Sequence, residues 1–268
     1  MKTLVNTLIK TAAITMTFLS LTVSAATIKT DVIFIVDESG SMGNVQTNLR
    51  NNIGLFASIL SGGGLVDASF GLVGYGNGGV VPRTLTDLTD PTAFALAAGN
   101  LIASGGTEPA YDAIAYALNT PNAYPGNVGA FSFRNDAITN IILLTDEPHN
   151  GSSTTWADTD GFLKANSALF NVVTTNSGNA TVNGGNFEQL AVDNGGAIFS
   201  LAAFNTNDNQ VITDFVTDFA NAKLQETIDF CTANPNDPAC TGVTPVPAPQ
   251  GLALLAMAIF AVRRMSKK

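Results

Sequence analysis

The chain has 268 residues, of which 46% are hydrophobic and 12% are charged, and this composition is sufficient for a sizeable folded core. Residues 1–26 and 251–268 contain no acidic residue and hold half of the 12 basic ones, so the body between them carries a charge near −15. Its few basic residues are scattered, whereas a nucleic-acid-binding protein needs a basic face to neutralise phosphates. The composition therefore argues against nucleic acid as a partner.

Residues 1–26 combine a lysine-bearing start, an apolar run and a small-residue ending. This order is typical of a secretory signal peptide, with cleavage after Ala25 or Ala26. The alternative is a buried helix or a membrane anchor, but threonines interrupt the run, which does not reach the about 20 apolar residues of a spanning helix. We therefore expect an exported protein.

Between residues 27 and 230, short apolar runs alternate with helical patterns. This alternation predicts one α/β domain of the doubly wound, Rossmann-like type, with a mostly parallel central sheet flanked by helices. In such a sheet, ligands bind beyond the carboxyl ends of the strands. Strands are expected at 31–36, 68–75, 80–85 (a short edge strand), 137–145, 168–174 and 197–203, and helices at 44–60, 91–101, 109–118, 187–193 and 209–229.

Three oxygen-bearing segments occupy this edge of the expected sheet. Asp37, Ser39 and Ser41 follow the first strand at alternate positions, Thr107 precedes a helix, and Asp146 follows the strand at 137–145. Oxygen ligands suit a hard cation, Mg²⁺ most naturally, with Mn²⁺ or Ca²⁺ as alternatives. Simple helix capping by the aspartate and first serine is the other interpretation, but it does not explain why three segments meet at one edge.

These segments have the order of a known motif. Asp-x-Ser-x-Ser at 37–41, Thr107 in GlyGlyThr and Asp146 in ThrAspGlu resemble the metal-ion-dependent adhesion site, or MIDAS, of the von Willebrand factor A-type (vWA) domain. The sequence GlyLeuValGlyTyr at 71–75 resembles the second strand of that domain. The resemblance covers roughly residues 29–229.

The resemblance implies a role for each residue of the motif. Ser39 and Ser41 would bind the metal directly, Asp37 and Asp146 would act mainly through waters, and Thr107 would join in the high-affinity state. The remaining coordination position would take a carboxylate of a protein or extracellular-matrix partner.

Three nearby residues have open roles. Glu147 stands where many members of that family have glycine, and this extra carboxylate would either tighten the cation or discourage an anionic ligand. His149 is the only histidine and is expected in a surface loop. Trp156 is expected in the same loop, either in contact with a sugar or a protein partner or as half-buried support.

The end of the chain resembles a second known signal. A proline-rich spacer containing ValProAlaPro at 246–249, an apolar run at 251–262 and a basic end resemble the PEP-CTERM sorting tail of bacterial exported proteins, although alanine replaces the usual glutamate. The resemblance implies that residues 251–268 anchor the chain transiently in the inner membrane until an exosortase-like enzyme releases it to the cell surface or extracellular matrix. The alternative is a plain C-terminal membrane anchor.

Cys231 and Cys240 are the only cysteines, and they bracket a turn-rich segment of a chain that we expect to be exported. This combination predicts a disulfide. Residues 231–250 would then form a disulfide loop and a proline-rich linker after the domain at 27–230.

The function that fits these observations is that of a secreted, non-catalytic adhesion or interaction domain. One alternative is a structural matrix protein whose metal only stabilises the fold, and a less favoured one is a metal-dependent hydrolase. The pattern Gly-x-Ser-x-Gly is absent at Ser39 and Ser41, and a single histidine leaves no choice of base for a serine hydrolase. An aspartyl phosphate mechanism would need a second aspartate where Ser39 stands.

Overall fold

The computed structural model of the chain describes residues 27–61, 64–77, 81–175 and 186–241. These residues belong to one compact unit, Ala26–Val243. The expected signal peptide at 1–26, the ValProAlaPro box and the sorting tail at 251–268 lie outside the described residues. Within the described ranges, no helix has both the length and the apolar character needed to cross a membrane.

A six-stranded sheet lies at the centre of this unit, with the strand order β3-β2-β1-β4-β5-β6. All neighbouring strands are parallel except β3, which runs antiparallel to β2 at one edge. The prediction of a doubly wound, mostly parallel sheet is therefore confirmed. The strands are β1 (Ile28–Asp37), β2 (Val66–Tyr75), β3 (Arg83–Thr89), β4 (Ile138–Thr145), β5 (Leu169–Thr174) and β6 (Ile198–Ser200).

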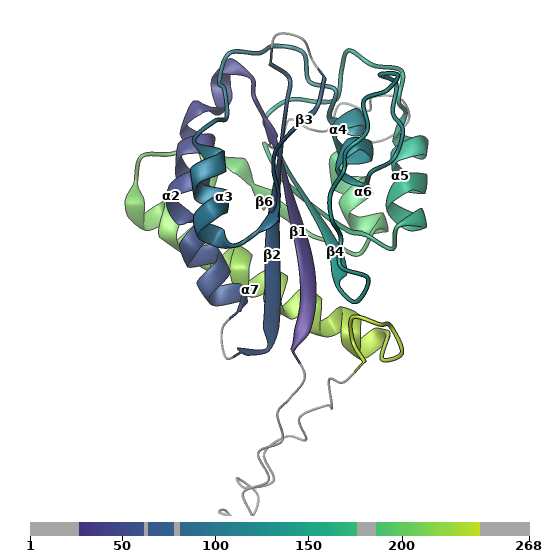
Figure 1. Ribbon diagram of the computed structural model, residues 1–268. Helices are drawn as coiled ribbons and strands as arrows, with labels where there is room; N and C mark the ends of the chain where they lie inside the picture. The colour runs from purple at the N-terminus through teal and green to yellow at the C-terminus, as the bar shows by residue number, and fades with distance from the viewer. Residues whose placement is uncertain (1–26, 62–63, 78–80, 176–185, 242–268) are drawn as a thin grey trace, which may run out of the picture. The chain divides into compact units, whose positions relative to one another are not determined.

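Helices cover both faces of the sheet (Figure 1). One face carries α2 (Gly43–Leu60), α3 (Pro91–Ala98) and α7 (Asn209–Ala233), and the other carries α4 (Ala110–Ala117), α5 (Trp156–Ala165) and α6 (Phe187–Asp193). The central strand β1 is apolar throughout its middle because alternate residues enter different cores. Phe34 packs in the core under α2, whereas Ile33 and Ile35 pack in the core under α4.

Most of the expected elements are present, but several boundaries differ. The edge strand covers 83–89 rather than 80–85, and α3 ends at Ala98, before Gly99. The expected strand at 197–203 is a three-residue strand followed by a 3-10 helix at Leu201–Ala203. A short apolar run in the sequence does not distinguish a strand from a 3-10 helix, because either conformation can bury the apolar side chains of such a run.

Helix α5 is absent from the sequence-based prediction, which placed Trp156 in a loop. Its start carries a capping box, in which the Thr155 hydroxyl accepts from the Asp158 amide and the Asp158 carboxylate accepts from the Thr155 amide. Thr-x-x-Asp before a helix is a recognised start signal, so the sequence did contain the information.

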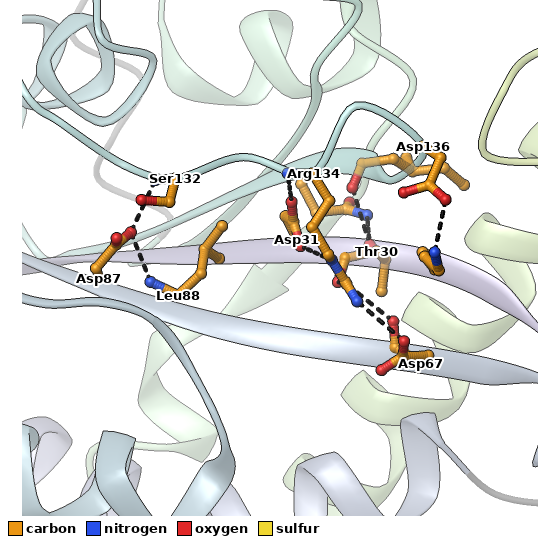
Figure 2. Close-up of polar contacts among 11 residues, drawn as sticks. Thr30, Asp31, Asp67, Asp87, Leu88, Ser132, Arg134 and Asp136 are labelled. Atoms are coloured by element: carbon orange, nitrogen blue, oxygen red, sulfur yellow. Dashed lines mark hydrogen bonds and ion pairs between the residues drawn. The ribbon is translucent and has the colours of Figure 1, made fainter.

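Arg134 joins three segments at the amino ends of the strands (Figure 2). Its Nε and backbone N donate to the two carboxylate oxygens of Asp31 in β1, both at 2.7 Å. Its Nη1 donates to Asp67 in β2 at 3.0 Å, and its Nη2 donates to the carbonyl of Thr30 at 2.8 Å. Because Asp31 is only 1% exposed, these bonds offset the cost of burying its charge.

Lys223 connects α7 to the sheet in a similar way. Its ammonium group is fully buried, donates to the side chain of Asn140 in β4 and pairs with Glu226. Asn140 in turn donates to Thr30 in β1 at 2.8 Å. Burial lowers the pKa of Lys223, while Glu226 opposes this effect. The long helix is therefore held in one position on the sheet by a polar network as well as by apolar contacts.

The predicted disulfide is confirmed, because Cys231 and Cys240 are bonded with a Cα to Cα distance of 5.2 Å. The helix α7 continues to Ala233, beyond the predicted end at 229, so Cys231 lies inside its last turn. The bridge thus fastens the segment that follows α7 back onto the helix.

Candidate metal centre

The Asp-x-Ser-x-Ser segment forms a compact turn at the carboxyl end of β1. The backbone amide of Ser39 donates to Asp37 Oδ1 at 2.7 Å, and the hydroxyls of Ser39 and Ser41 lie 3.2 Å apart. Simple capping does not explain this turn, because the residue at the N-cap of α2 is Met42 and the Ser39 side chain makes no capping hydrogen bond. The turn therefore gathers one carboxylate and two hydroxyls without using them to cap a helix.

Asp37 is fully buried beneath this turn. Its Oδ2 lies 3.0 Å from the hydroxyl of Thr145, the last residue of β4. Burial raises the pKa of Asp37 to about 7, the hydrogen bonds from Ser39 and Thr145 oppose the rise, and the charge of Glu108 adds to it. Without a cation, this carboxyl group is therefore about half protonated near neutral pH.

Glu38 connects the same turn to the loop at residues 99–109, between α3 and α4. Its carboxylate accepts from Arg83 Nη2 at 2.6 Å and from the amide of Ile102 at 2.8 Å, and it is only 1% exposed. Its carbonyl accepts from the amides of Ser104 and Gly105 at 3.0 and 2.9 Å. The loop that carries the predicted threonine ligand is thus anchored directly to the motif.

Thr107 packs against Gly76 and Gly151, two glycines from other segments of the chain. A Cβ added to Gly76 would be 3.2 Å from the Thr107 carbonyl and 3.4 Å from Asp37 Oδ1, so these two groups flank the same glycine. A Cβ added to Gly151 would be 2.3 Å from the Thr107 methyl group. Both glycines have positive φ, which favours glycine, and their lack of a side chain permits the close approach.

Two further carboxylates at this edge have a buried oxygen with no hydrogen-bond partner among the described residues. They are Asp146, which follows β4, and Glu108, which follows Thr107. The hydroxyl of Tyr75, at the end of β2, is also buried without a partner among the described residues. Burial raises the pKa of Tyr75 most, and the charges of Asp37, Glu108 and Asp146 raise it further. The predicted ligands at the ends of β1 and β4 and before α4 therefore share one edge of the sheet.

The donor set fits a small hard cation. Within the ranges that the structure describes, no three His, Cys, Asp or Glu side chains are close enough to hold a metal by themselves. The hydroxyls of Ser39 and Ser41, the Thr107 hydroxyl and water would have to complete the sphere, and Mg²⁺ keeps several waters when it binds to one or two carboxylates. The unpartnered oxygens of Glu108 and Asp146 are costly to bury without a cation, which supports this fit.

The prediction that His149 lies in a surface loop is wrong, because its side chain is 2% exposed. Its ring stacks on Tyr111 with centroids 4.2 Å apart, and its Nδ1 accepts from the Tyr111 amide at 3.2 Å. Burial lowers its pKa to about 4, while the charge of Asp112 opposes this effect, so the ring is neutral at pH 7. His149 thus joins the loop after Asp146 to Tyr111 in the first turn of α4.

Trp156 is half-buried at the first turn of α5 and packs against the core under α4. Its Nε1 donates to the carbonyl of Asn186 at 3.1 Å. This position matches the interpretation of Trp156 as half-buried support. Glu147, by contrast, is exposed at the rim of the site, and its charge raises the pKa of Glu108.

The fold and the site together define an α/β domain that gathers carboxylate and hydroxyl groups at the carboxyl edge of its sheet. The family model for the von Willebrand factor type A domain matches residues 31–217, and the chain belongs to this family. The resemblance stated from the motif alone is thereby confirmed for the domain.

The solved structures that match this chain include two of proximal thread matrix protein 1 from the mussel byssus. The first match has 15% sequence identity, a TM-score of 0.47, and covers 72% of this chain and 48% of the mussel protein. The second has 14% identity, a TM-score of 0.48, and covers 74% and 48%. The matched region thus spans about half the length of the mussel protein. No curated protein matches the sequence.

The buried position of the Glu38 carboxylate, between Arg83 and the amide of Ile102, predicts that alanine is not tolerated at Gly74. A Cβ there would lie 2.6 Å from Glu38 Oε2, so the carboxylate would have to leave its place beside Arg83. We expect Gly74→Ala to lower the free energy of unfolding by about 1–3 kcal/mol in urea denaturation, as overpacked cores do.

Gly54→Ala is the matched control for this substitution. Gly54 is exposed in α2 with open space around its Cα, and alanine there should raise the free energy of unfolding by about 0.5–1 kcal/mol. An unchanged urea midpoint for Gly74→Ala would show that Glu38 does not occupy the place described.

Proposed function

We propose that the chain is an exported, non-catalytic adhesion or interaction domain that binds a protein or matrix partner through a divalent cation. Domains of this family generally mediate interactions with proteins or matrix. The observation that carries the proposal is the convergence of the motif at one edge, with Asp37 bonded to Ser39, the Ser39 and Ser41 hydroxyls adjacent, and Thr107 beside Gly76. Mg²⁺ is the preferred ion, with Mn²⁺ or Ca²⁺ as alternatives.

In this proposal each residue keeps the role that the family motif implies. Ser39 and Ser41 bind the ion directly, Asp37 and Asp146 act through waters, and Thr107 joins in the high-affinity state. Ser41 is exposed, so the ion would face solvent on this side. A carboxylate of the partner takes the remaining position, and the cation supplies the charge that attracts it.

Two observations favour a binding role over a hydrolytic one. The only histidine of the chain is buried and neutral, and its Nδ1 is occupied by the amide of Tyr111. A serine nucleophile needs a base within hydrogen-bond reach, and Ser39 has its partner in Ser41 instead. A purely structural role of the cation is the second candidate, and dependence of partner binding on the ion separates the two.

The disulfide supports the proposal of export, because disulfides persist in oxidising compartments. We propose that residues 1–26 direct secretion and that residues 251–268 hold the chain transiently in the inner membrane. An exosortase-like enzyme would then release the domain to the cell surface or extracellular matrix, with the 231–250 segment as its linker.

The first test is capture of a partner from the surface material of the producing cells. Immobilised domain, residues 27–241, should retain a protein or polymer in 5 mM Mg²⁺ and lose it in excess chelator, because the ion bridges the two molecules. The Asp37→Ala, Asp146→Ala double variant should retain nothing in either buffer. Equal capture by wild type with and without chelator would leave only the structural role of the cation.

The second test is the pH dependence of cation binding. Because the pKa of Asp37 is about 7 in the metal-free domain, a cation must displace a proton from it below neutral pH. Affinity for Mn²⁺ should therefore rise as pH increases, by about tenfold between pH 6 and pH 8 in titration calorimetry. Asp37→Asn should bind weakly at every pH, and equal wild-type affinity at pH 6 and 8 would contradict the role of this proton.

The third test concerns the fate of the tail. The apolar run at 251–262 would form a helix of about 18 Å, shorter than the hydrocarbon core of about 30 Å, and is a poor permanent anchor. Intact-mass measurement of protein from the cell surface should place the new C-terminus near residues 246–251. Recovery of the uncut chain in the membrane fraction at steady state would favour the plain anchor.

A further inference from the structure

Glu108 is an acidic residue of this edge that the sequence motif does not include. It follows Thr107 directly and is held by Asn150, from the loop after β4. Asn150 Nδ2 donates to Glu108 Oε2 at 2.6 Å, and the Glu108 amide donates to Asn150 Oδ1 at 3.1 Å. The Asn150 amide also donates to the Glu108 carbonyl at 2.9 Å. These three bonds hold both the backbone and one carboxylate oxygen of Glu108 in place.

The second carboxylate oxygen of Glu108 is buried without a partner. The residue is 1% exposed, and Oε1 makes no hydrogen bond among the described residues. The ion pairs of the described ranges use other acids, so no lysine or arginine there neutralises Glu108. A buried carboxylate with one donor is unfavourable unless a positive charge compensates it.

The groups around Glu108 make its charge more costly still. Burial raises the pKa of Glu108 most, Asn150 opposes this effect, and the charges of Glu147 and Asp146 add to the rise. The charge of Glu108 in turn acts on Asp37. Glu108 therefore lies within electrostatic reach of Asp37, Asp146 and Glu147, and a cation at this edge would relieve its repulsion with them.

We propose that Glu108 is a further residue of the cation site and that its free oxygen Oε1 takes up the cation or a water of its hydration shell. This inference rests on the proposed function of the edge as a cation site. It adds a third buried or half-buried carboxylate to the two, Asp37 and Asp146, that the motif supplies. Cation affinity in oxygen-ligand sites rises with the number of charged ligands, so Glu108 should tighten binding.

The substitution Glu108→Gln tests this directly, because glutamine keeps an oxygen to accept from Asn150 but removes the charge. In titration calorimetry of the domain with Mn²⁺ and with Mg²⁺ at pH 8, we expect the affinity of Glu108→Gln to be at least tenfold lower than that of wild type. Glu188→Gln, in the first turn of α6, makes the same change of charge away from the site and should bind like wild type.

Thermal unfolding separates this role from a merely structural one. Without metal, Glu108→Gln should melt at or above the wild-type temperature, because an uncompensated buried charge is gone. In saturating Mn²⁺ its melting temperature should rise less than that of wild type. Equal losses of melting temperature with and without Mn²⁺ would show that Glu108 only supports the fold, and would overturn the inference.

The failure of this inference and the failure of the proposed function give different results. If Glu108→Gln binds Mn²⁺ like wild type while the Asp37→Ala, Asp146→Ala double variant does not bind, the inference is overturned and the cation site stands. If wild type binds none of Mg²⁺, Mn²⁺ and Ca²⁺, both are overturned.

Discussion

The carboxyl edge of this domain depends on two consecutive buried carboxylates, Asp37 and Glu38, at the end of the central strand β1. Burying an acid is unfavourable unless hydrogen bonds or a positive charge compensate it. Glu38 is compensated within the protein, by Arg83 from the edge strand β3 and by the amide of Ile102. The hydrogen bond from Ile102 also fastens the 99–109 loop, which carries Thr107, to the motif.

Asp37 is compensated differently, and this difference gives the edge its chemistry. It receives hydrogen bonds from Ser39 and Thr145, while the charge of Glu108, which also acts on it, is negative. Glu108 and Asp146 add buried oxygens that have no partner among the described residues. Negative charge concentrated in this way is favourable for binding a cation, and the hydroxyls of the motif offer neutral ligands beside it.

At the amino ends of the strands, the protein balances such charges with its own basic side chains. Arg134 neutralises Asp31 and Asp67, and Lys223 pairs with Glu226 while bonding to Asn140. Both networks join elements distant in sequence, and both are complete in the described structure without any added group. The fold thus has one edge with internally paired charges, which gives rigidity, and one edge with uncompensated acids, which suits ligand binding.

The sequence by itself determined the fold class, the order of most elements, the disulfide and the grouping of Asp37, Ser39 and Ser41, because apolar periodicity and strand-end position depend on neighbouring residues. The sequence also contained the start signal of α5, a capping box at Thr155, although the apolar periodicity alone did not predict this helix. Only the tertiary structure decided that Glu38 turns toward Arg83, that Glu108 is buried against Asn150 and that His149 is buried. The partners concerned lie 45, 42 and 38 residues away in the chain. Whether a polar side chain is buried or exposed depends on what a distant segment offers it, and local pattern carries no information about that segment.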